Sequence, residues 1–195
     1  MGKQIWKPGT MIYPVPAVMV SCGKSPEDIN IITIAWTGII ATNPAMCYIS
    51  IRPERYSYEI IKKDMAFVIN LTTKKLAYAT DWCGVKSGRD HNKFKEMKLT
   101  YQSGDKTGVA IINESPINLE CIVKEIKPLG SHDMFIAEIV SVIADDNYID
   151  TTTGALDLKK TDPLAYCHGK YYTLGEYQGK FGWSVEKKKN TKRKK

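Results

Sequence analysis

Six short segments of this chain are rich in valine, isoleucine and aromatic residues, and proline, glycine or asparagine residues bound them. Such composition, with stretches of alternating apolar and polar residues, is typical of β-strands. The segments are PVPAVMVSCG, NIITIAW, MCYISIR, AFVINL, INLECIVKEI and MFIAEIVSVIA. Helical patterns are fewer, and they fall between the strands at residues 56–63, 74–83 and 92–97. The pattern predicts a mainly β fold, a barrel with a few inserted helices.

The positive charge of the chain is concentrated at its C-terminal end. Of the formal net charge of +7, residues 186–195 contribute +6, from seven basic residues and one acidic residue, which leaves +1 for residues 1–185. We therefore expect one domain over residues 1–185 and a basic, disordered tail over residues 186–195. A nucleic-acid-binding tail is the less favoured alternative, because no recognition helix, zinc-finger spacing or aromatic RNA-binding motif accompanies it.

The spacing of cysteine and histidine residues argues against several kinds of disulfide, redox and metal site. The five cysteines contain no C-x-x-C pair, which argues against a disulfide scaffold, a zinc site or a dithiol redox centre. Cys22, Cys47 and Cys121 lie in apolar runs and are expected to be core residues. The three histidines lack metal-ligand spacing, so we predict no metal site. The first residues contain no secretory signal and no apolar run is long enough to span a bilayer, so we expect a cytoplasmic protein.

The stretch SGRDHNKF, which begins at Ser87, combines groups that bind a phosphate. Ser87 offers a hydroxyl, Gly88 permits close backbone approach, and Arg89 and Lys93 bring two positive charges to the predicted start of a helix. The alternative is an ordinary helix entry with Asp90 as the capping residue and two solvated basic side chains. The stretch by itself leaves both possibilities open.

Seven segments between residues 14 and 172 follow one another as YPVPAVMVSCG, NIITIAWTGIIATNPAMCYISIRPERYSYEII, FVINL, CGVKSGRDHNKF, LECIVKEI, GSHDMFIAEIVSV and DPLAYCHGKYY. In this order they resemble the flavin reductase-like family, and more narrowly its flavoredoxin branch. The resemblance implies an FMN-binding split β-barrel that holds FMN non-covalently at its edge, often near a homodimer interface. It also implies reduction of the flavin by hydride from NAD(P)H or by electrons from another protein.

The same resemblance implies two groups of cofactor-binding residues. Against the isoalloxazine ring and ribityl chain it places Thr33, Ala35, Trp36, Thr37, Ser50, Ile51 and Arg52. Around the phosphate it places Arg55, Ser57, Ser87, Arg89 and Lys93. From the residue pattern alone, Trp36 and Ile51 would be core residues of a barrel, and Arg52 and Arg55 would flank a solvated turn at Pro53.

His132 lies on the turn GSHD, where similar flavin reductases have a histidine beside the nicotinamide and the flavin. Hydride transfer needs no general acid at carbon, so we expect His132 to position the nicotinamide or to stabilise charge on the reduced flavin. The alternative is a solvated turn histidine.

We therefore expect an FMN-binding oxidoreductase, either an NAD(P)H-linked flavin reductase with a flavin or ferric acceptor or a flavoredoxin-type protein. The alternative is an electron-transfer flavoprotein that a protein donor reduces and that lacks NAD(P)H activity. No G-x-G-x-x-G motif follows a strand, so any NAD(P)H must bind transiently over the flavin. We expect a homodimer, because the resemblance implies barrels in which the partner subunit completes the flavin pocket. Weaker support comes from aromatic residues of the C-terminal part that a lone domain would struggle to bury: Tyr166, Tyr171, Tyr172, Tyr177 and Trp183.

Overall fold

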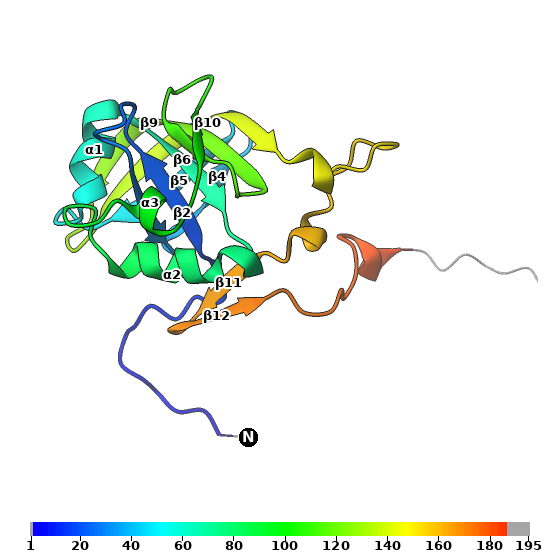
Figure 1. Ribbon diagram of the computed structural model, residues 1–195. Coiled ribbons are helices and arrows are strands. Elements are labelled where there is room, and N and C mark those ends of the chain that lie inside the picture. Colours follow the sequence, from blue (N-terminus) through cyan, green and yellow to red (C-terminus); the bar gives the residue numbers. More distant parts are fainter. Residues whose placement is uncertain (1, 187–195) are drawn as a thin grey trace, which may run out of the picture.

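The structure is a computed structural model that describes residues 2–186 (Figure 1). Its main element is one seven-stranded sheet in which every neighbouring pair of strands is antiparallel. In spatial order the strands are β3 (Asn30–Ile34), β2 (Val18–Cys22), β6 (Ala66–Leu71), β9 (Ile117–Pro128), β10 (Asp133–Ala144), β5 (Met46–Ile51) and β4 (Thr37–Ala41). All six segments predicted as strands belong to this sheet, and β4 is the strand that the sequence pattern missed.

The sheet curls into a split barrel because its two edge strands are consecutive in the chain. Only Ala35 and Trp36 separate β3 from β4, so one nearly continuous segment pairs first with β2 and then with β5. Beside this link, the Ser50 N–H donates to the Trp36 carbonyl oxygen at 2.9 Å. The predicted barrel fold is confirmed, and the link lies where the two edges of the sheet come together.

Apolar side chains from alternate strand positions fill the interior of the barrel. On β5, Cys47, Ile49 and Ile51 are buried, whereas the residues between them are half-exposed. The Cys47 and Cys121 sulfur atoms face each other at 3.6 Å in this core, and all five cysteines are free. Together with the buried Cys22, these positions confirm the prediction that three cysteines are core residues.

Three helices form at the predicted places. They are α1 (Tyr56–Asp64), α2 (Ala77–Val85), which follows the 3₁₀ turn η1 (Lys74–Leu76), and α3 (Lys93–Glu96). Helix α1 packs Tyr58 and Ile61 into the same cluster as the barrel interior. Helices α2 and α3 cover the outer side of β2 and β3, where they pack around Met19 and Ile31. The helices therefore lie on both sides of the strand β3.

A second sheet brings together the two ends of the domain. Its strands, in order, are β1 (Val15–Pro16), β11 (Leu164–Cys167) and β12 (Lys170–Thr173). The turn between β11 and β12 is His168–Gly169, with φ angles of 48° and 83°. Positive φ at both central residues is typical of a type I′ hairpin, which usually has asparagine, aspartate or glycine in the first place. The histidine there explains why the sequence pattern did not predict the hairpin.

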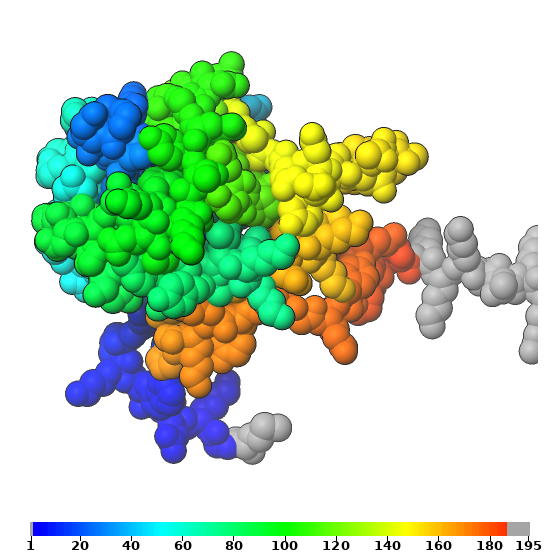
Figure 2. Space-filling view, viewed as in Figure 1, coloured from blue at the N-terminus to red at the C-terminus, as the bar shows by residue number. Residues whose placement is uncertain are grey.

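Short elements complete the described residues: β7 (Tyr101–Ser103), β8 (Ala110–Ile112), and the 3₁₀ turns η2 (Asp146–Tyr148), η3 (Leu158–Thr161) and η4 (Trp183–Val185). The N-terminal and C-terminal segments extend away from the barrel (Figure 2). Within residues 2–186, no helix is long and apolar enough to cross a membrane. Apart from Glu186, the predicted basic tail lies outside the described residues.

Candidate functional site

Two cavities adjoin each other along the outer edge of the barrel. The first has a volume of about 370 Å³ and lies between the start of α1, the end of α2 and the loop that leads to α3. The second has a volume of about 460 Å³ and lies between β3, β5 and the turn that carries His132. Ile32 and Arg55 line both cavities. Each volume falls in the range of small-molecule and cofactor sites, and the shared residues make the two cavities one elongated site.

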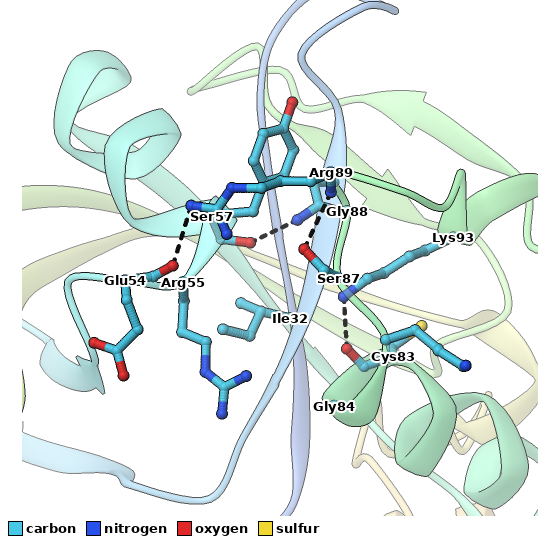
Figure 3. A pocket seen from close by; sticks show the side chains of 13 residues that line it. Ile32, Glu54, Arg55, Ser57, Cys83, Gly84, Ser87, Gly88, Arg89 and Lys93 are labelled. Atoms are coloured by element: carbon cyan, nitrogen blue, oxygen red, sulfur yellow. Dashed lines mark hydrogen bonds between the residues drawn. The ribbon is translucent and has the colours of Figure 1, made fainter.

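Four basic side chains line the first cavity, and three of them, which come from different elements, are labelled in Figure 3. Arg55 is the residue that precedes α1, Arg89 comes from the loop after α2, and Lys93 begins α3. The Arg89 guanidinium donates to the Glu54 carbonyl oxygen at 3.1 Å and lies over the Tyr56 ring, 5.7 Å from its centre. Arg89 thereby joins the α2–α3 loop to the start of α1, and its remaining donors are available to a ligand.

The Lys93 side chain is buried, which argues against the alternative of a solvated basic side chain at an ordinary helix entry. Its Nζ atom donates to the Ile31 carbonyl oxygen at 2.7 Å and to the Cys83 carbonyl oxygen at 2.6 Å. An ammonium group has three protons, so one remains for a ligand in the cavity that Lys93 lines. Burial lowers the pKa of Lys93 from its usual value. The capping residue of α3 is Asn92, and not Asp90, since the Asn92 side chain accepts from the Lys95 N–H.

Helix α1 supplies the helix N-terminus that borders the first cavity. Its first residues, Tyr56 and Ser57, line the cavity, and the first N–H groups of an α-helix have no partner within the helix. The Ser57 hydroxyl is buried and accepts from the Asn30 side chain at 2.8 Å. Gly88 packs so closely against this corner that an added Cβ would lie 2.3 Å from the Asn30 Oδ1 atom. The glycine is thus required for the loop to approach α1.

The second cavity contains most of the residues predicted to contact the flavin ring. They are Thr33, Ala35, Trp36, Ser50, Ile51 and Arg52, with His132 at the rim. Trp36 is half-buried and lines the cavity, whereas Ile51 both lines it and belongs to the barrel core. Thr37 lines neither cavity, because its side chain is buried and donates to the Tyr48 carbonyl oxygen at 2.6 Å. Eleven of the twelve predicted cofactor-binding residues therefore line one of the two cavities.

His132 ends the four-residue turn that connects β9 to β10, in which the Leu129 N–H donates to the His132 carbonyl oxygen. Its Nδ1 atom lies 2.9 Å from the Ser131 hydroxyl. Partial burial, followed by the positive charge of Arg52 and Arg55, lowers the pKa of His132 from its usual value near 6.5. The imidazole is therefore neutral at pH 7, and it can donate or accept a hydrogen bond without adding a charge to the cavity.

A hydrogen bond between Tyr58 and Asp133 connects α1 to the turn that carries His132. The Tyr58 hydroxyl donates to the Asp133 carboxylate at 2.6 Å, and the Tyr58 ring packs edge-on against Phe135. The carboxylate is the main cause that raises the pKa of Tyr58 to about 12. This contact fixes the start of β10, and with it the position of His132, relative to α1.

The substitution Tyr58→Phe should remove this contact and keep the ring in the core. We expect the variant to unfold more easily by about 1.5 kcal/mol at pH 7, the loss of a hydrogen bond to a charged group. The folded protein retains a proton that an unfolded tyrosine loses near pH 10, so the stabilisation is fully present below pH 10 and is lost as the pH rises toward 12. Urea unfolding of wild type and variant at pH 7, 10 and 11 measures this effect. A difference in the free energy of unfolding that stays constant up to pH 11 would contradict the hydrogen bond from Tyr58 to Asp133.

The sequence analysis missed several residues that line the two cavities: Asn30, Ile32, Ile34, Glu54, Tyr56, Cys83, Gly84, Lys86, Gly88 and Tyr166. Gly88 was recognised for its backbone but not placed in the cofactor set. Alternation along β3 could have indicated Ile32, which lies between residues that were predicted. Tyr166 comes from β11, more than a hundred residues away from β5, and no local pattern indicates that it reaches this cavity.

Known proteins resemble this chain in sequence and in fold. The family model described as "Flavin reductase like domain" matches residues 10–175. The chain belongs to the flavin reductase-like family. Its fold resembles the flavoredoxin of Desulfovibrio vulgaris (Miyazaki F), with a TM-score of 0.87, 27% identity and coverage of 95% of this chain and 100% of that chain.

Two further proteins are similar to this chain, one in sequence and one in fold. A protein of Archaeoglobus fulgidus is 29% identical over 163 residues, which are 83% of this chain and 89% of the relative. A putative flavin reductase with a split barrel domain from Shewanella frigidimarina has a TM-score of 0.75 at 22% identity, with 85% of each chain covered. The predicted family and the predicted split-barrel architecture are thus confirmed.

Proposed function

We propose that this flavin reductase-like protein binds FMN, with the phosphate in the first cavity and the flavin ring in the second. The observation that supports this most strongly is the continuity of the two cavities through Ile32 and Arg55. The first cavity offers cations, hydroxyl groups and a helix N-terminus, which together suit a phosphate dianion. The second offers a tryptophan and isoleucine side chains together with polar groups, which suit a flat aromatic ring that carries hydrogen-bonding atoms.

The residues of the first cavity fit a phosphate in charge and in donor type. Arg55 and Arg89 provide planar guanidinium groups, which can bind phosphate oxygens in pairs. Lys93 adds a charge that is already held in place by two carbonyl oxygens, so little side-chain freedom is lost on binding. The Ser87 hydroxyl accepts from the Arg89 N–H at 3.2 Å, which leaves its own proton for a ligand.

We further propose that the protein is an oxidoreductase that accepts electrons from NAD(P)H. Bound FMN would supply the two-electron chemistry, because its ring can accept a hydride. His132 stands at the rim of the ring cavity as a neutral imidazole, where it can hold the nicotinamide in a productive orientation. Trp36 and Tyr166 line that cavity with aromatic rings, which suit packing against a flavin.

An electron-transfer flavoprotein without NAD(P)H activity would use the same site. The two functions differ in the source of electrons, so anaerobic mixing of the flavin-loaded protein with NADH or NADPH distinguishes them. Bleaching of the flavin absorbance by either nucleotide, followed by turnover with free flavin or a ferric chelate, supports the reductase. A wild-type protein that dithionite bleaches and neither nucleotide reduces would leave the electron carrier as the function.

The substitution Arg89→Ala should weaken FMN binding without unfolding the protein, because Arg89 is exposed. We expect about a tenfold to hundredfold rise in the Kd for FMN, the effect of losing one charge-assisted contact. Riboflavin has no phosphate, so wild type and variant should bind it equally. Fluorescence titration with both ligands measures this, and an unchanged Kd for FMN would remove Arg89 from the phosphate site.

We also propose that the protein is a homodimer, because apolar side chains on both terminal segments face solvent. Tyr166 and Tyr171 pack on each other within the chain, with ring centres 5.7 Å apart. In contrast, large side chains that lie beyond the barrel are strongly exposed: Ile5, Trp6, Ile12, Tyr177, Phe181 and Trp183. Exposed apolar surface of this extent is typical of an interaction site. Sedimentation equilibrium should give the mass of a dimer, and a monomer that still holds flavin would contradict the proposal.

A further inference from the structure

Arg52 differs from the other basic residues of the site because it lines only the second cavity. It directly follows β5, and the antiparallel register pairs Ile51 with Asp133. One step beyond this pair, Arg52 lies opposite His132 across the two strands. Arg52 is therefore a cation beside His132, and it lies outside the first cavity, whereas Arg55 lines both cavities.

The positive charge of Arg52 is only weakly neutralised. Its recorded polar contact is with the Glu54 carboxylate at 3.5 Å, and the two side chains are 50% and 65% exposed. An exposed ion pair with that geometry contributes little interaction energy. Among the described residues, no carboxylate lines the second cavity, and the carboxylate next to His132, that of Asp133, already accepts from Tyr58 at 2.6 Å. Arg52 thus offers a guanidinium group to a ligand that enters this cavity.

We propose that Arg52 anchors a phosphate group of the pyridine dinucleotide that donates hydride at this site. The inference rests on the proposed function, in which the FMN phosphate occupies the other cavity and is bound by Arg55, Arg89 and Lys93. A guanidinium group binds phosphate oxygens in a planar, two-pronged geometry, and it does so best when no strong ion pair competes. Arg52 is therefore a substrate-binding residue, distinct from the flavin-ring contact expected from the sequence.

The dinucleotide has two possible anchoring groups, the pyrophosphate of both NADH and NADPH and the additional 2′-phosphate of NADPH. Stopped-flow reduction of the FMN-loaded protein at a series of concentrations of each nucleotide distinguishes them. We expect Arg52→Ala to raise the half-saturating concentration about tenfold to hundredfold, for both nucleotides if the pyrophosphate is bound and for NADPH alone if the 2′-phosphate is bound. The limiting rate and the Kd for FMN should stay within about twofold, since neither depends on this contact.

Two matched variants sharpen the test. Arg52→Lys keeps the charge and loses the planar guanidinium group. Its half-saturating nucleotide concentration should therefore lie between those of wild type and Arg52→Ala. Lys159→Ala removes an exposed positive charge of η3 outside both cavities and should behave as wild type. Raising the ionic strength should weaken nucleotide binding to wild type more than to Arg52→Ala.

Three results would overturn the proposal, and each contradicts a different step of it. An Arg52→Ala variant with unchanged half-saturation for both nucleotides would remove Arg52 as an anchor and leave the proposed function intact. A large rise in the Kd for FMN in that variant would show that Arg52 binds the FMN cofactor and not the dinucleotide. A wild-type protein that holds FMN and is reduced by neither nucleotide would overturn both this inference and the reductase function.

Discussion

Replacing Lys93 by methionine should lower the free energy of unfolding by about 2–4 kcal/mol, even without cofactor, since it leaves two buried carbonyl groups without their donor. Those groups are the Ile31 and Cys83 carbonyls, which Lys93 joins across the gap between β3 and α2. Methionine keeps the apolar stem in the same space, so the effect reports the lost donor and not a cavity. Urea unfolding of the apoprotein measures the change.

The same variant should also bind FMN at least about tenfold more weakly, because one phosphate contact is lost. Lys86→Met is the matched control for stability, since Lys86 lines the same cavity but is exposed. We expect its free energy of unfolding to stay within about 0.5 kcal/mol of wild type. If Lys93→Met were as stable as wild type, the buried lysine would not be the link between β3 and α2 that the structure shows.

The substitution His132→Ala should slow reduction of the bound flavin by NAD(P)H by an order of magnitude or more, because misplaced reactants lose part of the advantage of proximity. His132 lines only the ring cavity and lies outside the phosphate cavity, so the Kd for FMN and the visible spectrum should change little. Stopped-flow traces of flavin bleaching at several NAD(P)H concentrations measure the rate.

Reduction by dithionite is the control for this variant, since a small reductant needs no nicotinamide position. Its rate should be the same in wild type and His132→Ala. Because the pKa of His132 is lowered, the imidazole is neutral from pH 7 upward, and the limiting rate in wild type should not change between pH 7 and 8.5 on account of this residue. Equal NAD(P)H rates in the two proteins would show that His132 is only a turn residue.

The parts of the fold that the sequence predicts are those with a strong local pattern. β6 and β9 are rich in valine, isoleucine and leucine, and both are predicted as strands. β4, with the sequence TGIIA, is short and directly follows β3, so no turn residue separates the two strands in the sequence. The bend between them at Ala35 and Trp36 depends on pairing with β5, which is a tertiary contact that local reasoning cannot supply.

In the site too, some residues can be predicted from neighbouring sequence, whereas others depend on contacts that form only on folding. The residues around Ser87 are predicted to form an anion site because several phosphate-binding groups lie close together in sequence. The burial of Lys93 was not predicted, since it depends on carbonyl groups of β3 and α2 that the chain brings together only on folding. The contribution of Tyr166 likewise depends on the β11–β12 hairpin, which places a distant aromatic ring beside the second cavity.

If the two adjoining cavities bind one FMN molecule with its phosphate in the basic cavity, the phosphate must contribute strongly to affinity. The most direct measurement is a fluorescence titration of the apoprotein with FMN and with riboflavin under the same conditions. We expect FMN to bind about a hundredfold more tightly or better, since several charge-assisted contacts reach its phosphate and none of them reaches riboflavin. Equal affinity for the two ligands, or binding of neither, would contradict it.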